Sequence, residues 1–201
     1  RYDLLLHQSK YPAVNQSTSE YTRELIEKHV SGRLKVAPEH TSDRVLSIMR
    51  KPSFNQFGEF KKIFDRINCE KGLRQQLIPY FISSHPGCKE EDMAELAVIT
   101  KRLDFHLEQV QDFYPTPSTL STCMYYTGYD PRTMEKVYTP VSHHEKEMQR
   151  ALIQYKKPEN YDLVKEALLA NNRNDLIGFG PKCLIPPRKI RSRSNEKSRK
   201  R

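Results

Sequence analysis

Three short apolar runs along the chain each end in a polar cluster, and a helical pattern follows each cluster. The first run, Leu34–Ala37, stops at Pro38, and polar residues 39–43 lead into apolar positions at helical spacing. The second run is Gln76–Ser83 and the third is His106–Tyr114. Strand–loop–helix units in series are typical of a parallel sheet, because parallel neighbours need a crossover connection between them. We therefore predict an α/β fold built on three parallel strands.

Apolar residues at three- and four-residue steps predict the helices around this sheet. The most regular pattern has phenylalanines at positions 57, 60 and 64, which favours packing against the sheet over the lining of a cofactor pocket. The stretches Asn15–Ser19, Met124–Pro131 and Asp175–Pro187 are rich in turn-forming residues and are expected to be loops. The predicted helices are Ser17–Val30, a helix from Asp43, Phe54–Asn68, Glu90–Leu103, a short helix from Ser118, Ser142–Tyr155 and Pro158–Ala170.

Polar side chains follow each predicted strand at the point where a parallel sheet binds its ligands. The carboxyl ends of parallel strands meet at one edge of the sheet, and ligands of such folds sit there. Several charged and amide groups at one edge could coordinate a polar ligand, although a surface or capping role is equally expected for each residue singly. The candidates are Lys35, Glu39 and His40 after the first strand, Ser83, Ser84 and His85 after the second, and Gln109, Gln111, Asp112 and Tyr114 in the third.

Other groups that could bind metal have simpler explanations. His143 and His144 are adjacent, so on a helix they point about 100° apart, and a solvated helix start is favoured. The acidic residues 90–92 suit the first turn of a helix, where the positive end of the dipole lies. The four cysteines lie far apart without a CxxC pair, which indicates a cytoplasmic protein with reduced thiols. Nucleophile-elbow, HExxH and Walker motifs are absent from the sequence.

The net charge of +9 is concentrated at the end of the chain. Residues Arg188–Arg201 hold eight Lys or Arg and one Glu, which leaves 26 basic and 24 acidic residues in the rest. A segment with a single apolar residue cannot bury enough surface to order itself, so we expect a disordered, solubilising tail. Weak attraction to RNA or the ribosome is the alternative role for this tail. No apolar run approaches the roughly 20 residues of a membrane span, and no signal-peptide pattern is visible.

The chain begins at Arg1 with a segment that reads as the end of an element. Three parallel strands cannot close a barrel, and their edges would expose unpaired backbone groups. We therefore expect a fragment whose N-terminal half is missing, although an open sheet covered by its own helices also satisfies the pattern.

Several long strings of the sequence resemble YgiQ-type radical S-adenosylmethionine (SAM) proteins, and specifically their C-terminal half. They include SGRLKVAPEHTSDRVLSIMRKPS, IPYFISSHPGCKEEDMAELA and VQDFYPTPSTLSTCMYYTG. The resemblance extends to about Pro187, and radical-SAM methylthiotransferases are similar more distantly. It implies a partial (βα)₆ barrel, a [4Fe–4S] cluster, and reductive cleavage of SAM to a 5′-deoxyadenosyl radical. The CxxxCxxC cluster motif of that family is absent from this chain, so the cluster would be held by the missing half and this fragment alone would be inactive.

The resemblance also implies which residues face SAM or the substrate. Those positions lie after the fourth, fifth and sixth barrel strands, and they are Arg1, Tyr2, Asp3, Lys35, Glu39, His40, Ser83 and His85. It divides the chain into a barrel part (1–123), a helical extension (124–187) and the basic tail (188–201). Two alternatives of another class remain, namely an RNA- or ribosome-associated module acting through the tail and an independent interaction domain made of the helical hairpin 142–170.

Overall fold

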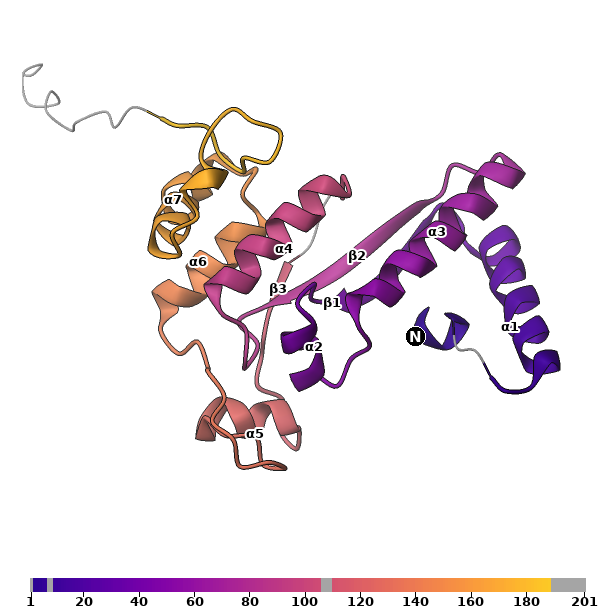
Figure 1. The fold of residues 1–201 in the computed structure, drawn as a ribbon, viewed down its shortest axis with the longest axis horizontal. Helices are drawn as coiled ribbons and strands as arrows, with labels where there is room; N and C mark the ends of the chain where they lie inside the picture. Colours follow the sequence, from indigo (N-terminus) through magenta and orange to yellow (C-terminus); the bar gives the residue numbers. More distant parts are fainter. Residues whose placement is uncertain (1, 7–8, 106–109, 189–201) are drawn as a thin grey trace, which may run out of the picture.

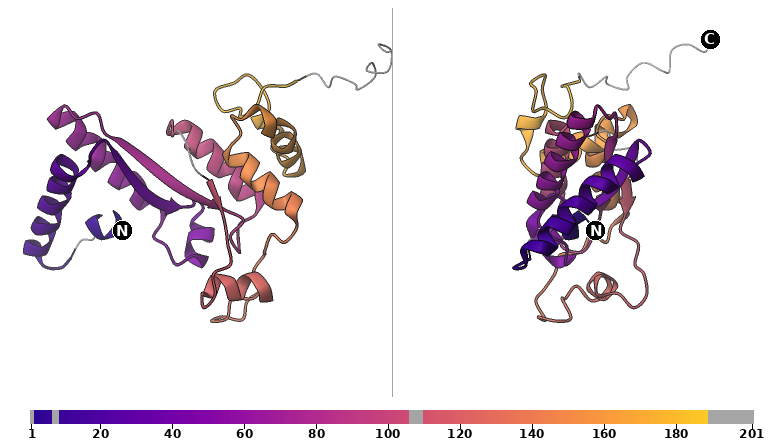
Figure 2. Two further views of the ribbon diagram at one scale, coloured as in Figure 1. Left: turned by 180° about the vertical axis from the view of Figure 1, so that it is seen from behind. Right: turned by 90° about the vertical axis from the view of Figure 1, so that its right-hand side faces the viewer.

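The structure is a computed structural model, and it describes residues 2–6, 9–105 and 110–188 of the 201-residue chain (Figure 1). The fold is a mixed α/β architecture. Helix α3 runs alongside β1 and β2 with α1 beyond it, and α4, α6 and α7 lie together near the carboxyl end of β2. Helix α5 is set apart, beyond the end of β3, and the view from behind in Figure 2 shows the same arrangement.

Three parallel strands form the sheet, in the order β1-β2-β3. They are β1 (Arg33–Glu39), β2 (Gln76–Ser83) and β3 (Val110–Asp112). In the register, Leu34 of β1 lies opposite Leu77 of β2, and Ser83 of β2 lies opposite Asp112 of β3. The predicted parallel sheet is therefore confirmed, and its three strands end at one edge. Positions 106–109 of the predicted third strand lie outside the described residues.

The described part of the chain contains seven α-helices and several shorter turns. Pro12 occupies the first turn of α1, where its missing N–H costs nothing. The side chain of Ser53 caps α3, and Gly72 ends that helix with a φ of 62°. The helices are α1 (Pro12–Glu24), α2 (Asp43–Ile48), α3 (Phe54–Lys71), α4 (Glu90–Arg102), α5 (Leu120–Thr127), α6 (His143–Ile153) and α7 (Tyr161–Ala170). The shorter ones are the π-turn Leu25–His29 and the 3₁₀ turns Tyr2–Leu6, Pro158–Asn160 and Asn174–Leu176.

Two stretches that were expected to be loops are helical. Residues 15–19 lie inside α1, where Asn15 exchanges two hydrogen bonds with the backbone of Ser9 at 2.6 and 2.9 Å. Thr18 donates its hydroxyl to the carbonyl of Val14 at 2.8 Å. The polar side chains of this run therefore find hydrogen-bond partners in or next to the helix. Residues 124–127 belong to α5, which ends at Gly128 with a φ of 72°. The loop prediction is therefore wrong at residues 15–16 and 124–127, whereas the helix predicted from Ser17 is confirmed as far as Glu24.

The apolar core consists of two clusters that meet on one face of β2. Leu77 and Phe81 are four residues apart, so they point to the same side of the strand. Leu77 packs with the phenylalanines of α3, and Phe81 packs with α4, α6 and α7. Phe54 contacts both groups, with its ring centroid 5.3 Å from that of Phe57 and 6.5 Å from that of Phe81. The prediction that α3 packs its aromatic stripe against the sheet is thus confirmed.

Helices α6 and α7 share the cluster of α4 instead of standing apart from it. Fully or almost fully buried side chains come from all three helices, including Leu96, Leu152 and Leu168. His144 of α6 lies 2.7 Å from the carboxylate of Glu166 in α7, which explains this histidine as a surface link between two helices. None of the helices that the structure describes is long and apolar enough to span a membrane.

Candidate functional site

A hollow of about 460 Å³ lies at the carboxyl ends of the three strands, and we call it the rim hollow. Its size falls within the range of ligand pockets, which run from roughly 300 to 1,000 Å³. Its walls mix apolar and polar side chains drawn from every strand exit and from α5. The lining residues are Glu39, Met49, Lys51, Ile82, His85, Gln111, Asp112, Phe113, Tyr114, Thr116, Thr119 and Ser121.

Left-handed residues other than glycine follow all three strands. Glu39 has a φ of 70° at the end of β1, and Ser84 has a φ of 62° just after β2. Ser118, in the segment between β3 and α5, has a φ of 66°. Such conformations cost roughly 1–3 kcal/mol each and gather at ligand sites and switch regions. Four other non-glycine residues of the described chain are also left-handed (Arg50, Asp104, Met134 and Asn172), so these conformations support the rim hollow as a site only together with its lining residues.

Glu39 and Lys51 form an ion pair on one side of the rim hollow. The Lys51 Nζ lies 3.1 Å from Glu39 Oε1, and the carboxylate is much less exposed than the ammonium, at 14% against 42%. The pair joins the end of β1 to the segment that follows α2. A polar ligand in the hollow would therefore meet a carboxylate whose charge is already partly balanced.

His85 and Ser121 form a hydrogen-bonded pair on another wall. His85 Nε2 lies 2.9 Å from Ser121 Oγ, and His85 Nδ1 lies 2.7 Å from the carbonyl oxygen of Pro86. The ring of Phe113 packs edge-on against the imidazole, with 5.0 Å between centroids. Burial lowers the pKa of His85 to about 4, and the hydrogen bond to Pro86 only partly opposes it. The imidazole is therefore neutral at physiological pH.

Asp112, at the end of β3, connects two strands and α6. Its Oδ1 accepts the hydroxyl of Ser83 at 2.6 Å and the Nε–H of Arg150 at 3.0 Å, and its Oδ2 pairs with the same guanidinium. A two-point Arg–carboxylate contact is among the stronger polar contacts in proteins because it fixes orientation as well as distance. Ser83 thus points toward β3, and Arg150 anchors α6 to the rim.

Gln149 ties α6 to the segment that leaves β2. The side chain is completely buried, accepts the N–H of Ser84 at 2.9 Å and donates to the carbonyl of Cys88 at 3.0 Å. Both partners are backbone groups that would otherwise be buried without a hydrogen bond. The segment Ser83–Cys88, which carries His85, is therefore tied to α6 by one amide, beside the bond that Arg44 donates to the carbonyl of Gly87.

His40 lies beside the rim hollow but does not line it. The ring is fully buried, and its Nδ1 accepts the N–H groups of Thr41 and Ser42, both at 2.9 Å. Its Nε2 lies 3.4 Å from the sulfur of Met93 and 3.4 Å from that of Cys88. Because Nδ1 accepts, the neutral ring carries its proton on Nε2, which faces the two sulfurs and is not free to ligate a metal. Burial lowers the pKa of His40 to about 4.

The other predicted site residues are spread around the sheet. Tyr2 is buried against α3 with its ring edge-on to Phe57, and burial, with the charges of Asp3 and Glu39, raises its pKa to about 12. Asp3 lines a different hollow beside the start of α3. Lys35 is exposed on β1, with its Nζ 5.8 Å from the ring centroid of Tyr80. Arg1 and Gln109 lie outside the described residues.

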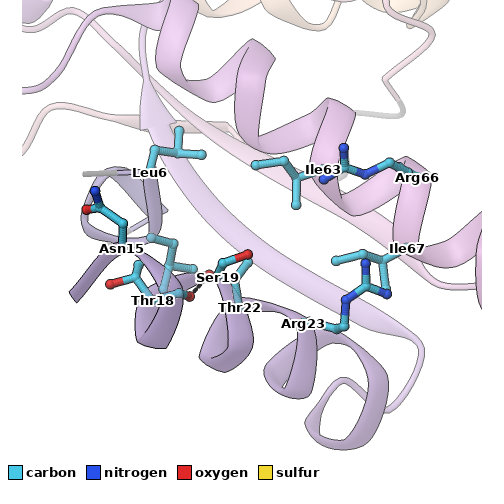
Figure 3. A pocket seen from close by; sticks show the side chains of 10 residues that line it. Leu6, Asn15, Thr18, Ser19, Thr22, Arg23, Ile63, Arg66 and Ile67 are labelled. Atoms are coloured by element: carbon cyan, nitrogen blue, oxygen red, sulfur yellow. Dashed lines mark hydrogen bonds between the residues drawn. The ribbon is translucent and has the colours of Figure 1, made fainter. Parts of the chain in front are cut away.

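A second hollow, of about 210 Å³, lies between the 3₁₀ turn Tyr2–Leu6, α1 and α3 (Figure 3). Several of its polar side chains already bind other groups of the protein. Thr22 donates to the carbonyl of Thr18 at 2.8 Å, and Arg23 contacts Glu70 at 2.9 Å and Glu27 at 3.2 Å. The rim hollow, with its strained exits and buried imidazole, is the stronger candidate site.

Six residues that the sequence predicted lie together around one edge of the sheet, namely Glu39, Ser83, His85, Gln111, Asp112 and Tyr114. Ser121, Gln149 and Arg150 were not predicted. The Ser- and Thr-rich residues 116–122, which follow the third strand, carried a signal for the first of them. The other two gave no signal, since a glutamine and an arginine on an amphipathic helix are ordinary surface residues.

Known proteins are similar to this chain over most of its length. Residues 108–201 match a family described as a domain of unknown function (DUF3362). A UPF0313 protein of Bacteroides thetaiotaomicron is 70% identical over 177 residues, which is 88% of this chain. The chain is similar to UPF0313 proteins over most of its length. Those of Porphyromonas gingivalis and Methanocella arvoryzae are 61% and 51% identical over 88% and 93% of the chain. The chain spans only 28–30% of the length of these three curated UPF0313 relatives.

Proposed function

We propose that this chain is the SAM- and substrate-facing part of a radical SAM enzyme, completed by a longer stretch of the same protein. The observation that carries the proposal is the rim hollow, with polar groups from three parallel strand ends and a left-handed residue at each exit. The sequence resemblance to YgiQ-type proteins supplies the chemistry. The length of the UPF0313 relatives leaves room for a further half-barrel.

The open edge of β1 supports the barrel interpretation. Among the described residues, β1 pairs with β2 on one side and with no strand on the other. A strand edge beside which no other described strand lies is a ready template for another strand. In the proposed enzyme the missing half of the barrel pairs along this edge, so that the rim hollow becomes one wall of a larger cavity.

The residues of the rim hollow fit a ligand such as SAM, which has an ammonium group, a carboxylate and ribose hydroxyls. Glu39 and Asp112 carry carboxylate oxygens that suit the ammonium and hydroxyl groups, and the side chain of Ile82 offers an apolar surface. When SAM is bound beside a reduced [4Fe–4S] cluster, it supplies a 5′-deoxyadenosyl radical for hydrogen abstraction. The role of this chain is to bind and orient SAM and the substrate and to keep water from the cavity.

The cysteines of this chain do not fit a [4Fe–4S] cluster. Cys88 is fully buried beside His40, Cys69 is exposed, and no three His, Cys, Asp or Glu side chains gather closely enough within the described residues to hold a metal. In the proposed enzyme the cluster is held by the missing half.

Anaerobic reconstitution of the full-length protein with iron and sulfide tests the proposal. A reductant and SAM are then added, and 5′-deoxyadenosine is measured by chromatography, with and without fractions of cell extract as a source of substrate. The expected result is deoxyadenosine that depends on iron and reductant. A protein that takes up iron and sulfide but never cleaves SAM would contradict the proposal.

A further inference from the structure

The hydrogen bonds of His85 have a fixed direction. A carbonyl oxygen can only accept, so the 2.7 Å contact with Pro86 places a proton on His85 Nδ1. Because the ring is neutral, Nε2 then carries a lone pair and can only accept. The hydroxyl of Ser121, 2.9 Å away, must therefore be the donor. A chain of two bonds runs from Ser121 through the imidazole to the backbone.

This direction determines what Ser121 can offer to a ligand. A serine hydroxyl has one proton and two lone pairs, and here the proton is committed to the imidazole. Within the described residues, no hydrogen bond in which another group donates to Ser121 Oγ is found, and the side chain lines the rim hollow. We propose that Ser121 is an acceptor-only site that selects ligands presenting a hydroxyl or amine at this point of the hollow.

The surroundings of Ser121 define the rest of the ligand. Asp112 already holds Arg150, and Glu39 already holds Lys51, so the strongest donors of this edge are directed at carboxylates. The side chains of Ile82 and Phe113 supply apolar surface on the same hollow. The ligand class is therefore a small alcohol or amine with an apolar body. This selection depends on the direction of the hydrogen bonds alone and is the same with or without radical chemistry.

Matched small probes test the selection. The full-length protein, without added iron or SAM, is titrated with benzyl alcohol, benzylamine and benzyl methyl ether, and binding is followed by saturation-transfer NMR. The alcohol and the amine should bind at least about threefold more tightly than the ether, since one hydrogen bond is lost with the ether. The Ser121→Ala variant should lose this preference, and the control Ser47→Ala, an exposed serine of α2, should keep it.

A second variant separates the direction of the bonds from the mere presence of a hydroxyl. Asparagine reaches the position of His85 Nδ1 but not that of Nε2, so His85→Asn keeps the bond to Pro86 and frees the Ser121 proton. The ether should then bind as well as the alcohol. In the wild-type protein, ¹⁵N NMR should show a neutral His85 protonated at Nδ1. Equal binding of alcohol and ether to wild type, no binding of the alcohol, or a ring protonated at Nε2 would each overturn the inference. None of these readouts depends on SAM cleavage.

Discussion

Gln149 of α6 accepts a hydrogen bond from the backbone N–H of Ser84 at 2.9 Å. The same amide donates to the carbonyl of Cys88, so one side chain spans the segment that presents His85 to the rim hollow. The helical part of the chain is thereby joined to the strand ends through the interior of the protein. The position of the imidazole depends on a helix that begins about 60 residues later in the sequence.

Replacing Gln149 with leucine should destabilise the protein by about 2–4 kcal/mol, because two buried backbone groups lose their partners. Chemical denaturation gives the free energy of unfolding. Gln56→Leu is the matched control, since Gln56 is exposed on α3, and it should change stability by less than about 0.5 kcal/mol. Equal effects of the two substitutions would show that the buried amide does not hold the Ser83–Cys88 segment.

Arg150→Met should lower the free energy of unfolding by about 1 kcal/mol, because Asp112 loses the guanidinium that contacts both of its oxygens. The effect stays small because the guanidinium is exposed to solvent, which weakens the ion pair. Lys62→Met removes an exposed pair with Glu59 within a single helix and should cost about 0.5 kcal/mol or less. Both variants are compared by denaturation at low and moderate salt. If Arg150→Met lowers the free energy of unfolding no more than Lys62→Met does, Arg150 does not anchor α6 to the strand ends.

Two glycines should respond oppositely to alanine. Gly87 has a φ of 87°, and a Cβ there would meet the side chain of Ile48, so Gly87→Ala should destabilise by about 1–3 kcal/mol. Gly58 lies inside α3 with open space around it, so Gly58→Ala should stabilise by about 0.5–1 kcal/mol. Thermal unfolding of the two variants provides the measurement. Tolerance of alanine at position 87 would mean that the exit of β2 is less constrained than its geometry indicates.

The two buried histidines should make the protein sensitive to acid. Burial lowers the pKa of both His40 and His85 from 6.5 to about 4, so below pH 6.5 the unfolded chain binds protons that the folded chain does not. Their contribution to stability is therefore present above pH 6.5 and lost as the pH falls toward 4, by about 3 kcal/mol for each histidine.

Urea denaturation between pH 7.5 and 4.5 measures this slope. His40→Asn keeps an acceptor for the N–H groups of Thr41 and Ser42, and His85→Asn keeps the donor to Pro86, so each variant should flatten the slope without removing those bonds. Slopes that stay unchanged in both variants would assign the acid sensitivity to other groups.

The sheet was predictable because its signal is local. Each strand is a short apolar run closed by polar residues, and parallel pairing follows from the helices that separate the runs. A buried helix face is likewise indicated by the spacing alone of Phe57, Phe60 and Phe64. The loop predicted over residues 15–19, which overlapped the helix predicted from Ser17, was wrong because hydrogen bonds within the helix, such as that of Thr18, outweighed the turn-forming tendency of Ser, Thr and Asn.

The site was predictable only in part because its contacts are long-range. The end of a strand can be found from sequence, which identified Glu39 and His85. The partners of His85 and Asp112 come from α5 and α6, and no spacing rule links Ser121 to His85 or Arg150 to Asp112. His40 shows the opposite case, in which a polar residue at a strand exit turns inward to pack against two sulfurs.

The most direct test of the central claim is a crystal structure of the full-length protein, reconstituted anaerobically and soaked with SAM. We expect SAM against the rim hollow, within hydrogen-bond distance of Glu39 or Asp112, and a further strand paired to the open edge of β1. SAM bound away from these strand ends, or a β1 edge covered by something other than a strand, would contradict it.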